Sequence, residues 1–293
     1  MLKPTIVLEI GCNHKGSYLI AKDMIEQITS VESPFNTVIK FQKRNAKELL
    51  SEEQYNAPHP NPKNSYGKTY GEHRKALELD IHQHKDLKHL IESLGMIYST
   101  SIWDMTSCKE VVSLEPELIK IPSAMNTNYE MLDYLCKNYS GRIHLSLGMT
   151  TKKEEKEILN IFRINDRRKD LVLYACTSGY PIEESEVYAL ELKRLQCIYK
   201  GIINSVGYSS HLKGIDWDVL LCAMGASYLE RHFTLNKKWK GTDHSASIDL
   251  KDYIKLVNKL KILNEIMQYK PEKLIDTELT QYNKLKYKEE VII

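Results

Sequence analysis

The chain has 293 residues, of which 42% are hydrophobic and 27% are charged, and its formal net charge is +2. This composition supports a large core under a solvated surface and excludes the disordered and fibrous classes. The charge is too small to indicate a nucleic-acid or membrane partner. Glu9 interrupts the short apolar run at the amino terminus, so that run does not resemble a signal peptide. We therefore expect a soluble, cytoplasmic protein whose six scattered cysteines are reduced.

Short apolar and β-branched runs alternate along the chain with amphipathic stretches. Eight runs are predicted as strands: Thr5–Ile10, Thr37–Gln42, Met96–Ser101, Glu117–Ile121, Arg142–Leu147, Leu171–Cys176, Asn204–Ser209 and Ser227–His232. The stretches Tyr18–Thr29, Ile81–Leu94 and Lys152–Asn165 are apolar on one face and are predicted as helices. Eight such units favour a single-domain α/β fold, a (β/α)8 TIM barrel, over an open doubly wound sheet. The polar tail from about Tyr269 is expected to extend the last helix.

Polar side chains stand where these strands end. They are Glu9, Lys40, Lys120, Ser146, Thr177, Ser209 and His232. In a TIM barrel the carboxyl ends of all strands converge on one mouth, where active sites form. A buried parallel strand should be plainly apolar, so Lys40 and Lys120 at the ends of two such strands are costly unless they are paired.

One connection, from Lys43 to about Leu79, is unusually long. Connections of more than about 15 residues in a compact domain are usually functional lids or disordered segments. This one carries the cations Lys68, His73, Arg74 and Lys75. On composition alone, a solvated basic loop is a better interpretation than an anion site.

Two histidines, His211 and His232, follow neighbouring strands and are candidate ligands of one divalent metal ion. The alternative is that each is a satisfied polar residue at the barrel rim. The patterns favour neither interpretation.

Lys40 and Lys120, together with Ser123, Ser146 and Ser209, suit a small anion such as a phosphate or carboxylate. The alternative is that the lysines reach solvent or pair with Glu9 and Glu230. Glu9 itself is a candidate base, a group beside the metal, or a partner of a lysine.

Several motifs, in order and at barrel spacing, resemble the synthase domain of the sialic acid synthases. They are Glu9-Ile10-Gly11-x-Asn13-His14-x-Gly16, Lys40-Phe41-Gln42, Cys176-Thr177-Ser178-x-Tyr180-Pro181, Gly207-Tyr208-Ser209-x-His211 and Leu229-Glu230-Arg231-His232-Phe233-Thr234. The segments at 66–74 and 239–247 resemble the branch that makes nine-carbon 9-phosphates from a phosphorylated acceptor.

This resemblance implies a role for each matching residue. His211 and His232 would bind Mn²⁺ or Mg²⁺, and Glu9 would lie beside the metal and the reacting centre. Catalysis would depend on Glu9, Lys40 and Lys120. The substrate-binding residues would be Asn13, Gln42, Arg74, Ser123, Ser146, Ser178, Tyr180, Ser209 and Asp243. In the family's reaction the alkene carbon of phosphoenolpyruvate attacks the aldehyde of an open-chain sugar, water adds, and phosphate leaves.

The sequence departs from the family pattern in three respects. The family usually places an antifreeze-like domain after the barrel, and we expect residues 1–293 to form the barrel alone, without that domain. Met125 stands where the family has an acid near the sugar, and Ser210 stands where an Asp often precedes the first metal histidine. The first two departures leave the acceptor sugar open.

Three functions are therefore considered from the sequence. The first is a phosphoenolpyruvate-dependent transferase that makes a sialic acid or its 9-phosphate from an aldose, with N-acetylmannosamine 6-phosphate or mannose 6-phosphate as the first acceptors to test. The second is a related synthase of another 3-deoxy-2-keto sugar acid. The third is a non-catalytic barrel that binds a sugar phosphate. The sequence leaves the formation of a homo-oligomer open.

Overall fold

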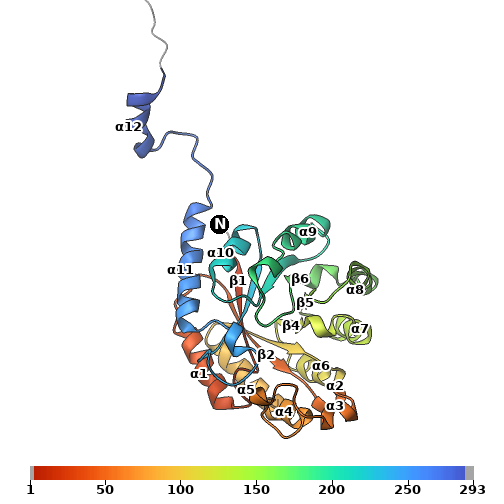
Figure 1. The fold of residues 1–293 in the computed structure, drawn as a ribbon. Helices are drawn as coiled ribbons and strands as arrows, with labels where there is room; N and C mark the ends of the chain where they lie inside the picture. Colours follow the sequence, from red (N-terminus) through yellow and green to blue (C-terminus); the bar gives the residue numbers. More distant parts are fainter. Residues whose placement is uncertain (1–2, 288–293) are drawn as a thin grey trace, which may run out of the picture.

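The computed structural model describes residues 3–287 and contains a closed barrel of parallel strands in the order β1-β2-β3-β4-β5-β6-β7-β8. The strands occupy the centre of the molecule and the helices surround them (Figure 1). The predicted TIM barrel is confirmed, and each predicted strand lies within one residue of its observed bounds. The strands are β1 (Thr5–Gly11), β2 (Thr37–Lys43), β3 (Ile97–Ile102), β4 (Leu118–Ile121), β5 (Arg142–Ser146), β6 (Leu171–Cys176), β7 (Ser205–Ser210) and β8 (Tyr228–His232).

Most helices begin where the sequence offers a capping side chain. Ser17, Asp80 and Thr151 each accept a hydrogen bond from a backbone N–H of the first turn that follows, which satisfies a donor that the helix leaves free. The helices are α1 (Tyr18–Thr29), α2 (Ala46–Leu49), α3 (Glu52–Asn56), α4 (Tyr70–Ala76), α5 (Ile81–Ser93), α6 (Met105–Val112), α7 (Tyr129–Asn138), α8 (Lys152–Ile164), α9 (Leu190–Ile198), α10 (Asp216–Ala223), α11 (Leu250–Ile266) and α12 (Asp276–Leu285). Among these described helices, α9, α10 and α12 have no capping side chain.

The alternation of side chains along each strand separates two environments. Side chains that point outward, such as Ile39 and Leu173, join the helices in two large apolar clusters. Side chains that point inward form a small apolar floor, which includes Val7, Val38 and Leu118. Because apolar residues fill this floor and the outer wall, the polar inward positions are concentrated toward the carboxyl ends of the strands.

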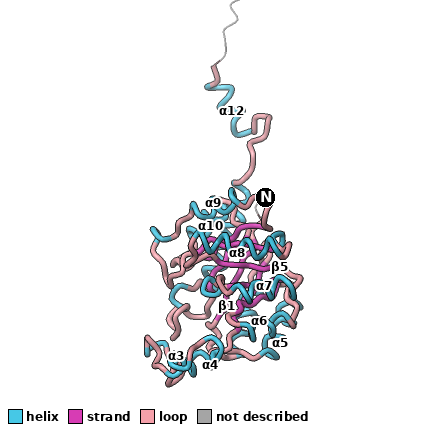
Figure 2. Tube along the Cα trace, turned by 90° about the vertical axis from the view of Figure 1, so that its right-hand side faces the viewer, coloured by secondary structure: helices cyan, strands magenta, loops and turns pink. Residues whose placement is uncertain are grey.

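The long connection after β2 is not a plain loop, because α2, α3 and α4 lie within it. Its α3–α4 part extends from one end of the barrel (Figure 2). The tyrosine hydroxyl of Tyr66 donates a hydrogen bond of 2.5 Å to the backbone oxygen of Lys240, which fastens this connection to the one between β8 and α11. The connection therefore covers part of the mouth.

The carboxyl-terminal segment differs from its prediction. The expected extension of the last helix is wrong, because α11 ends at Ile266 and α12 begins separately at Asp276. Both views show α12 apart from the barrel (Figures 1 and 2). Among the described residues, no helix is both long and apolar enough to cross a membrane.

Candidate active site

The carboxyl ends of the strands surround a cavity of about 220 Å³, which we call the deep cavity. All eight strands, or the residues directly after them, contribute to its wall. The sequence-predicted residues that line it are Glu9, Lys40, Gln42, Lys120, Ser123, Ser146, Ser178, Tyr180, Ser209, His211 and His232. The structure thus brings together the residues predicted to hold phosphoenolpyruvate and the metal.

Glu230 is the centre of the charge network in the deep cavity. Its Oε2 accepts a hydrogen bond of 2.9 Å from Lys120 Nζ, and its Oε1 accepts one of 3.1 Å from Ser209 Oγ. Lys40 Nζ lies 3.6 Å from Oε1 and also forms an ion pair with Glu9. The lysines therefore pair with Glu9 and Glu230, the alternative considered from the sequence, and they line the cavity at the same time.

These four charges shift one another's pKa values. Burial raises the pKa of the Glu230 carboxyl, but the two lysines outweigh burial and hold that pKa well below its ordinary value. Burial lowers the pKa of Lys120 more strongly than Glu230 raises it, so the net shift is downward. For Lys40 the pair of carboxylates outweighs burial, and its pKa is raised. The pKa of Glu9 is raised by burial, although Lys40 opposes that rise.

The histidine pair lies beside this network, with ring centroids 5.6 Å apart. The backbone oxygen of Thr177 lies 3.0 Å from His211 Nδ1, which assigns the proton to Nδ1 and leaves Nε2 as a ligand atom. Burial lowers the pKa of His211 to about 3, so this ring is neutral at pH 7. The Nδ1 atom of His232 is buried and has no hydrogen-bond partner among residues 3–287, and it lies 3.9 Å from Asp243 Oδ2.

A divalent ion fits these donors. Within residues 3–287 no three His, Cys, Asp or Glu side chains are already gathered as a metal cage. Two imidazoles with a neighbouring carboxylate nevertheless make a mixed nitrogen and oxygen donor set suited to a first-row ion such as Mn²⁺. The partnerless nitrogen of His232 is the observation that favours a ligand at this place, since buried polar atoms usually have partners.

A second cavity of about 290 Å³ adjoins the first, and we call it the outer cavity. Gln42, Trp103, Tyr180 and His232 line both cavities. The remaining predicted residues, Asn13, Arg74 and Asp243, line the outer cavity. No predicted site residue therefore lies outside the two cavities.

The basic loop contributes only part of its charge. His73 and Arg74 line the outer cavity, whereas Lys68 and Lys75 are exposed and do not. Burial lowers the pKa of His73 to about 4, and its Nδ1 accepts a hydrogen bond from the backbone of Tyr66, so it is neutral. Arg74 is the cation that this loop supplies, and its Nε donates a hydrogen bond of 3.0 Å to the Tyr70 hydroxyl.

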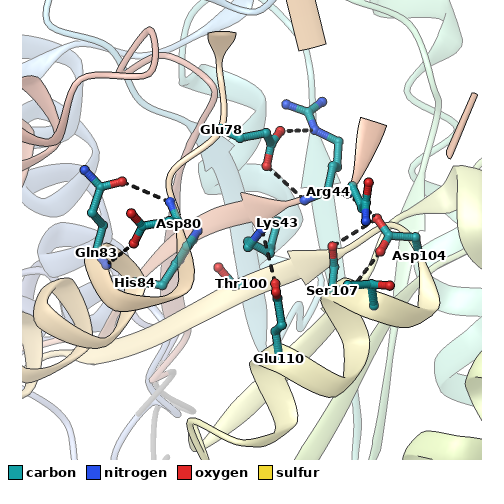
Figure 3. Close-up of polar contacts among 12 residues, drawn as sticks. Lys43, Arg44, Glu78, Asp80, Gln83, His84, Thr100, Asp104, Ser107 and Glu110 are labelled. Atoms are coloured by element: carbon teal, nitrogen blue, oxygen red, sulfur yellow. Dashed lines mark hydrogen bonds and ion pairs between the residues drawn. The ribbon is translucent and has the colours of Figure 1, made fainter. Parts of the chain in front are cut away.

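Arg44 is a second cation of the outer cavity, which the sequence did not single out. It is 3% exposed, and Glu78 accepts from both its Nε, at 2.7 Å, and its backbone N, at 2.9 Å (Figure 3). Another nitrogen of its guanidinium contacts Cys12 Sγ. Burial raises the pKa of the Cys12 thiol to about 11, although Arg44 opposes this, so Arg44 faces a neutral thiol. Its charge is held rigidly at the cavity wall.

Asn13, predicted to face the sugar, makes hydrogen bonds within the protein. The side-chain nitrogen of Asn13 donates to the backbone oxygen of Phe233, at 2.8 Å, and to Ser247 Oγ, at 2.9 Å. Its amide N–H groups therefore join two connections of the barrel and are not free for a sugar. Met125, at the position of the family's acid, packs against the outer apolar cluster, and Ala124 beside it lines the deep cavity.

Comparison with known proteins agrees with this geometry. The model of the NeuB family matches residues 29–272. The chain is 30% identical over 280 residues to N-acetylneuraminate-9-phosphate synthase of Homo sapiens, which covers 96% of this chain and 76% of that protein. It is 31% identical over 268 residues to N,N'-diacetyllegionaminic acid synthase of Campylobacter jejuni subsp. jejuni serotype O:2, covering 91% of this chain and 78% of the other.

The fold also resembles a solved structure. The N-acetylneuraminic acid (sialic acid) synthetase from Leptospira borgpetersenii serovar Hardjo-bovis, in complex with citrate, superimposes with a TM-score of 0.81 at 24% identity. The match covers 98% of this chain and 93% of that chain. At this identity the likeness concerns the fold.

Proposed function

The chain belongs to the NeuB family of phosphoenolpyruvate-condensing nonulosonic acid synthases, and from that premise we propose that its acceptor is an aldose phosphate. N-Acetylmannosamine 6-phosphate and mannose 6-phosphate are the first candidates. The products would be a nine-carbon 2-keto acid 9-phosphate and inorganic phosphate. The two relatives above are named for different products at nearly the same identity, so identity alone does not fix the acceptor.

We propose that phosphoenolpyruvate binds in the deep cavity. Lys40 and Lys120 supply two buried ammonium groups, and Ser123, Ser146 and Ser209 supply hydroxyl donors around them. Charge-assisted hydrogen bonds to a phosphate and a carboxylate are stronger than neutral ones, particularly where water is excluded. These groups would hold the substrate while its alkene carbon attacks the aldehyde, and they would stabilise the phosphate as it leaves.

His211 and His232 are proposed as the metal ligands, with Glu9 and Asp243 nearby. A divalent ion held there would act as a Lewis acid toward the sugar aldehyde. The protein's own contribution is to keep His211 neutral and correctly oriented through Thr177. Tyr180 covers this pair, because its ring centroid lies 4.1 Å from that of His211. Glu9, whose pKa is raised by burial, is the candidate base for the water that adds.

The cation content of the outer cavity is the observation that carries the phosphate proposal. Arg44, Arg74 and Lys240 line it, whereas Asp243 is the one carboxylate among its lining residues. A phosphate dianion needs two or more cations in a partly enclosed space, and guanidinium groups can meet it with two parallel hydrogen bonds. Glu78 already pairs with Arg44, whereas no ion pair in the described part of the chain engages Arg74 or Lys240, so a neutral sugar would leave these two cations without an anionic partner.

The two other functions considered from the sequence make different demands. A synthase of another 3-deoxy-2-keto acid would use the same deep cavity with a different acceptor in the outer one. A non-catalytic barrel would have no use for four charges buried at the strand ends, since even paired buried charges are often no more stabilising than apolar residues of similar volume. The intact deep cavity therefore favours an enzyme.

The decisive experiment measures phosphate release from phosphoenolpyruvate with Mn²⁺ over a panel of aldoses and their phosphates. We expect kcat/KM for a hexose 6-phosphate to exceed that for the free hexose. Equal values, or a preference for the free sugar, would refute the phosphate proposal. The absence of release with every aldose would favour the non-catalytic barrel instead.

Arg74→Ala tests the phosphate handle directly, with Lys75→Ala as its matched control. Both changes remove a cation from consecutive positions of α4, but only Arg74 lines the outer cavity. Arg74→Ala should erase the preference for the sugar phosphate and leave turnover of the free sugar nearly unchanged. Lys75→Ala should retain the preference. An equal loss in both variants would indicate a general charge effect and contradict the role of Arg74.

A further inference from the structure

One level of the barrel interior holds a tyrosine among charged side chains. In a TIM barrel, alternate strands contribute the inward side chains of one layer. The floor positions Val38, Leu118, Val172 and Tyr228 come from β2, β4, β6 and β8. Two residues further along the same strands lie Lys40, Lys120, Tyr174 and Glu230. Three members of this layer carry charges, and Tyr174 is its one uncharged member.

The contacts of Lys120 explain why an aromatic ring belongs in this layer. Its Nζ lies 3.4 Å from the centroid of the Tyr174 ring, well within the distance of a cation–π interaction. Its carboxylate partner is Glu230, at 2.9 Å, which is shared with Lys40 and Ser209. Lys40, by contrast, has Glu9 as well as Glu230. Where Lys40 has a second carboxylate partner, Lys120 instead has the ring face of Tyr174.

Tyr174 is itself held firmly. It is fully buried, and its hydroxyl lies 2.9 Å from Nδ1 of His144, which is also buried. The His144 ring packs edge-on against Tyr228 at a centroid distance of 4.6 Å. Because its hydroxyl is held by His144, the Tyr174 ring keeps one face toward the Lys120 ammonium and is not free to rotate.

We propose that Tyr174 is a positioning residue for phosphoenolpyruvate, which holds the ammonium of Lys120 at the floor of the deep cavity through its ring face. The proposal rests on the proposed binding of phosphoenolpyruvate by Lys120. A ring face stabilises a buried ammonium without neutralising its charge. A second carboxylate would neutralise it and would repel the incoming anion. Tyr174 therefore makes a buried lysine tolerable while its charge stays available to substrate.

The first test compares Tyr174→Phe with Tyr174→Leu, by measuring KM for phosphoenolpyruvate and kcat separately. The phenylalanine retains the ring face and should retain a KM close to that of the wild type. The leucine removes the ring face and should raise KM roughly tenfold or more, the effect expected of a desolvated cation–π contact. Tyr98→Leu is the matched control. Tyr98 is another buried strand tyrosine whose hydroxyl lies 2.8 Å from a histidine Nδ1, that of His84, but it belongs to an outer apolar cluster and lines neither cavity, so KM should stay unchanged. Equal KM values in the leucine and phenylalanine variants at position 174 would overturn the proposal.

A second series avoids any dependence on how well the leucine variant folds. Replacing Tyr174 by phenylalanine and then by trifluorophenylalanine keeps the shape of the ring while fluorine withdraws charge from its face. KM for phosphoenolpyruvate should rise from the phenylalanine to the trifluorophenylalanine variant, whereas a merely structural role would leave it equal in the two. Equal values in these two variants would overturn the proposal.

A double-mutant cycle distinguishes failure of this proposal from failure of the proposed function. Unfolding by urea is measured for Tyr174→Leu, Lys120→Met and the combination, without any substrate. A coupling of at least roughly fivefold in the unfolding equilibrium constant is expected if the ring stabilises the ammonium. Coupling in a protein that lacks phosphoenolpyruvate-dependent activity would refute the proposed function alone. Additive effects in an active enzyme would refute the role of Tyr174 alone.

Discussion

Glu230→Gln removes one charge from the centre of the deep cavity and keeps the size of the side chain. In the wild type this carboxylate is 6% exposed and accepts from Lys120 at 2.9 Å, with Lys40 at 3.6 Å. Glutamine would leave two buried ammonium groups with Glu9 alone. Breaking a buried pair by removing one partner costs about 3–5 kcal/mol. With an unfolding entropy of about 2.1 cal/mol/K per residue, that corresponds to a fall in Tm of roughly 5–8 °C for a chain of 293 residues.

The same change should strengthen the binding of anions. The wild-type cavity balances two lysines against two carboxylates, whereas Glu230→Gln has one positive charge in excess. Inorganic phosphate, measured by thermal shift, should therefore raise Tm of the variant more than Tm of the wild type. Glu155→Gln is the control. Glu155 is 5% exposed and accepts from Arg194 at 2.7 Å, outside the deep cavity, so phosphate should not rescue that variant selectively.

The deficit should also depend on pH. Burial lowers the pKa of Lys120, and loss of Glu230, which opposes that fall, would lower it further. When a lysine has a lower pKa in the folded than in the unfolded state, where it is about 10.4, the unfolded state binds more protons. Stability then rises with pH between the two values. The Tm difference between wild type and Glu230→Gln should consequently shrink from pH 7 to pH 9.

Two results would refute this reasoning. A variant as stable as the wild type would mean that Glu230 does not compensate the lysines. A destabilised variant that phosphate stabilises no more than it stabilises the wild type would mean that the released charge does not face the cavity.

Two further predictions concern the proposed substrate and metal sites. Lys120→Met and Lys40→Met should each raise KM for phosphoenolpyruvate more than tenfold, because a charge-assisted contact is worth about 1.5–3 kcal/mol; a change confined to KM for the sugar would contradict the anion role. His211→Ala and His232→Ala should each abolish turnover and weaken Mn²⁺ binding in calorimetry while leaving the circular dichroism spectrum unchanged; metal-dependent turnover near that of the wild type in either variant would exclude that histidine as a ligand.

The barrel and the deep cavity were predictable because their residues are costly at their positions. A lysine that ends a run such as Val38-Ile39-Lys40 conflicts with a buried strand unless it has a function, and two histidines after neighbouring strands are equally unusual. Glu230 was visible as a partner for the lysines, but its place at the centre of the network was not. Its central place depends on which carboxylate oxygen each of Ser209, Lys40 and Lys120 contacts, and a sequence does not contain that geometry.

Arg44 and Tyr174 show where sequence reasoning ended. Arg44 directly follows β2, a position where the sequence pattern gives no sign of burial. Its burial depends on an ion pair with Glu78, which lies 34 residues further along the chain. Tyr174 lies in the mainly apolar run of a buried strand, so the sequence pattern predicts only that it belongs to the hydrophobic core. Its importance arises from β4, two strands away in the barrel, which brings Lys120 over the ring. Asn13 was assigned to the sugar by resemblance, although its amide hydrogens bond Phe233 and Ser247.

The proposed reaction must occur at the boundary that the two cavities share. Carbon–carbon bond formation needs the alkene carbon of one substrate within reach of the aldehyde of the other. Gln42, Trp103, Tyr180 and His232 line both cavities and thus border that meeting point. The nitrogen of Trp103 is buried without a hydrogen-bond partner in the described part of the chain. This indole N–H is therefore placed to donate a hydrogen bond to a substrate bound at the boundary of the two cavities.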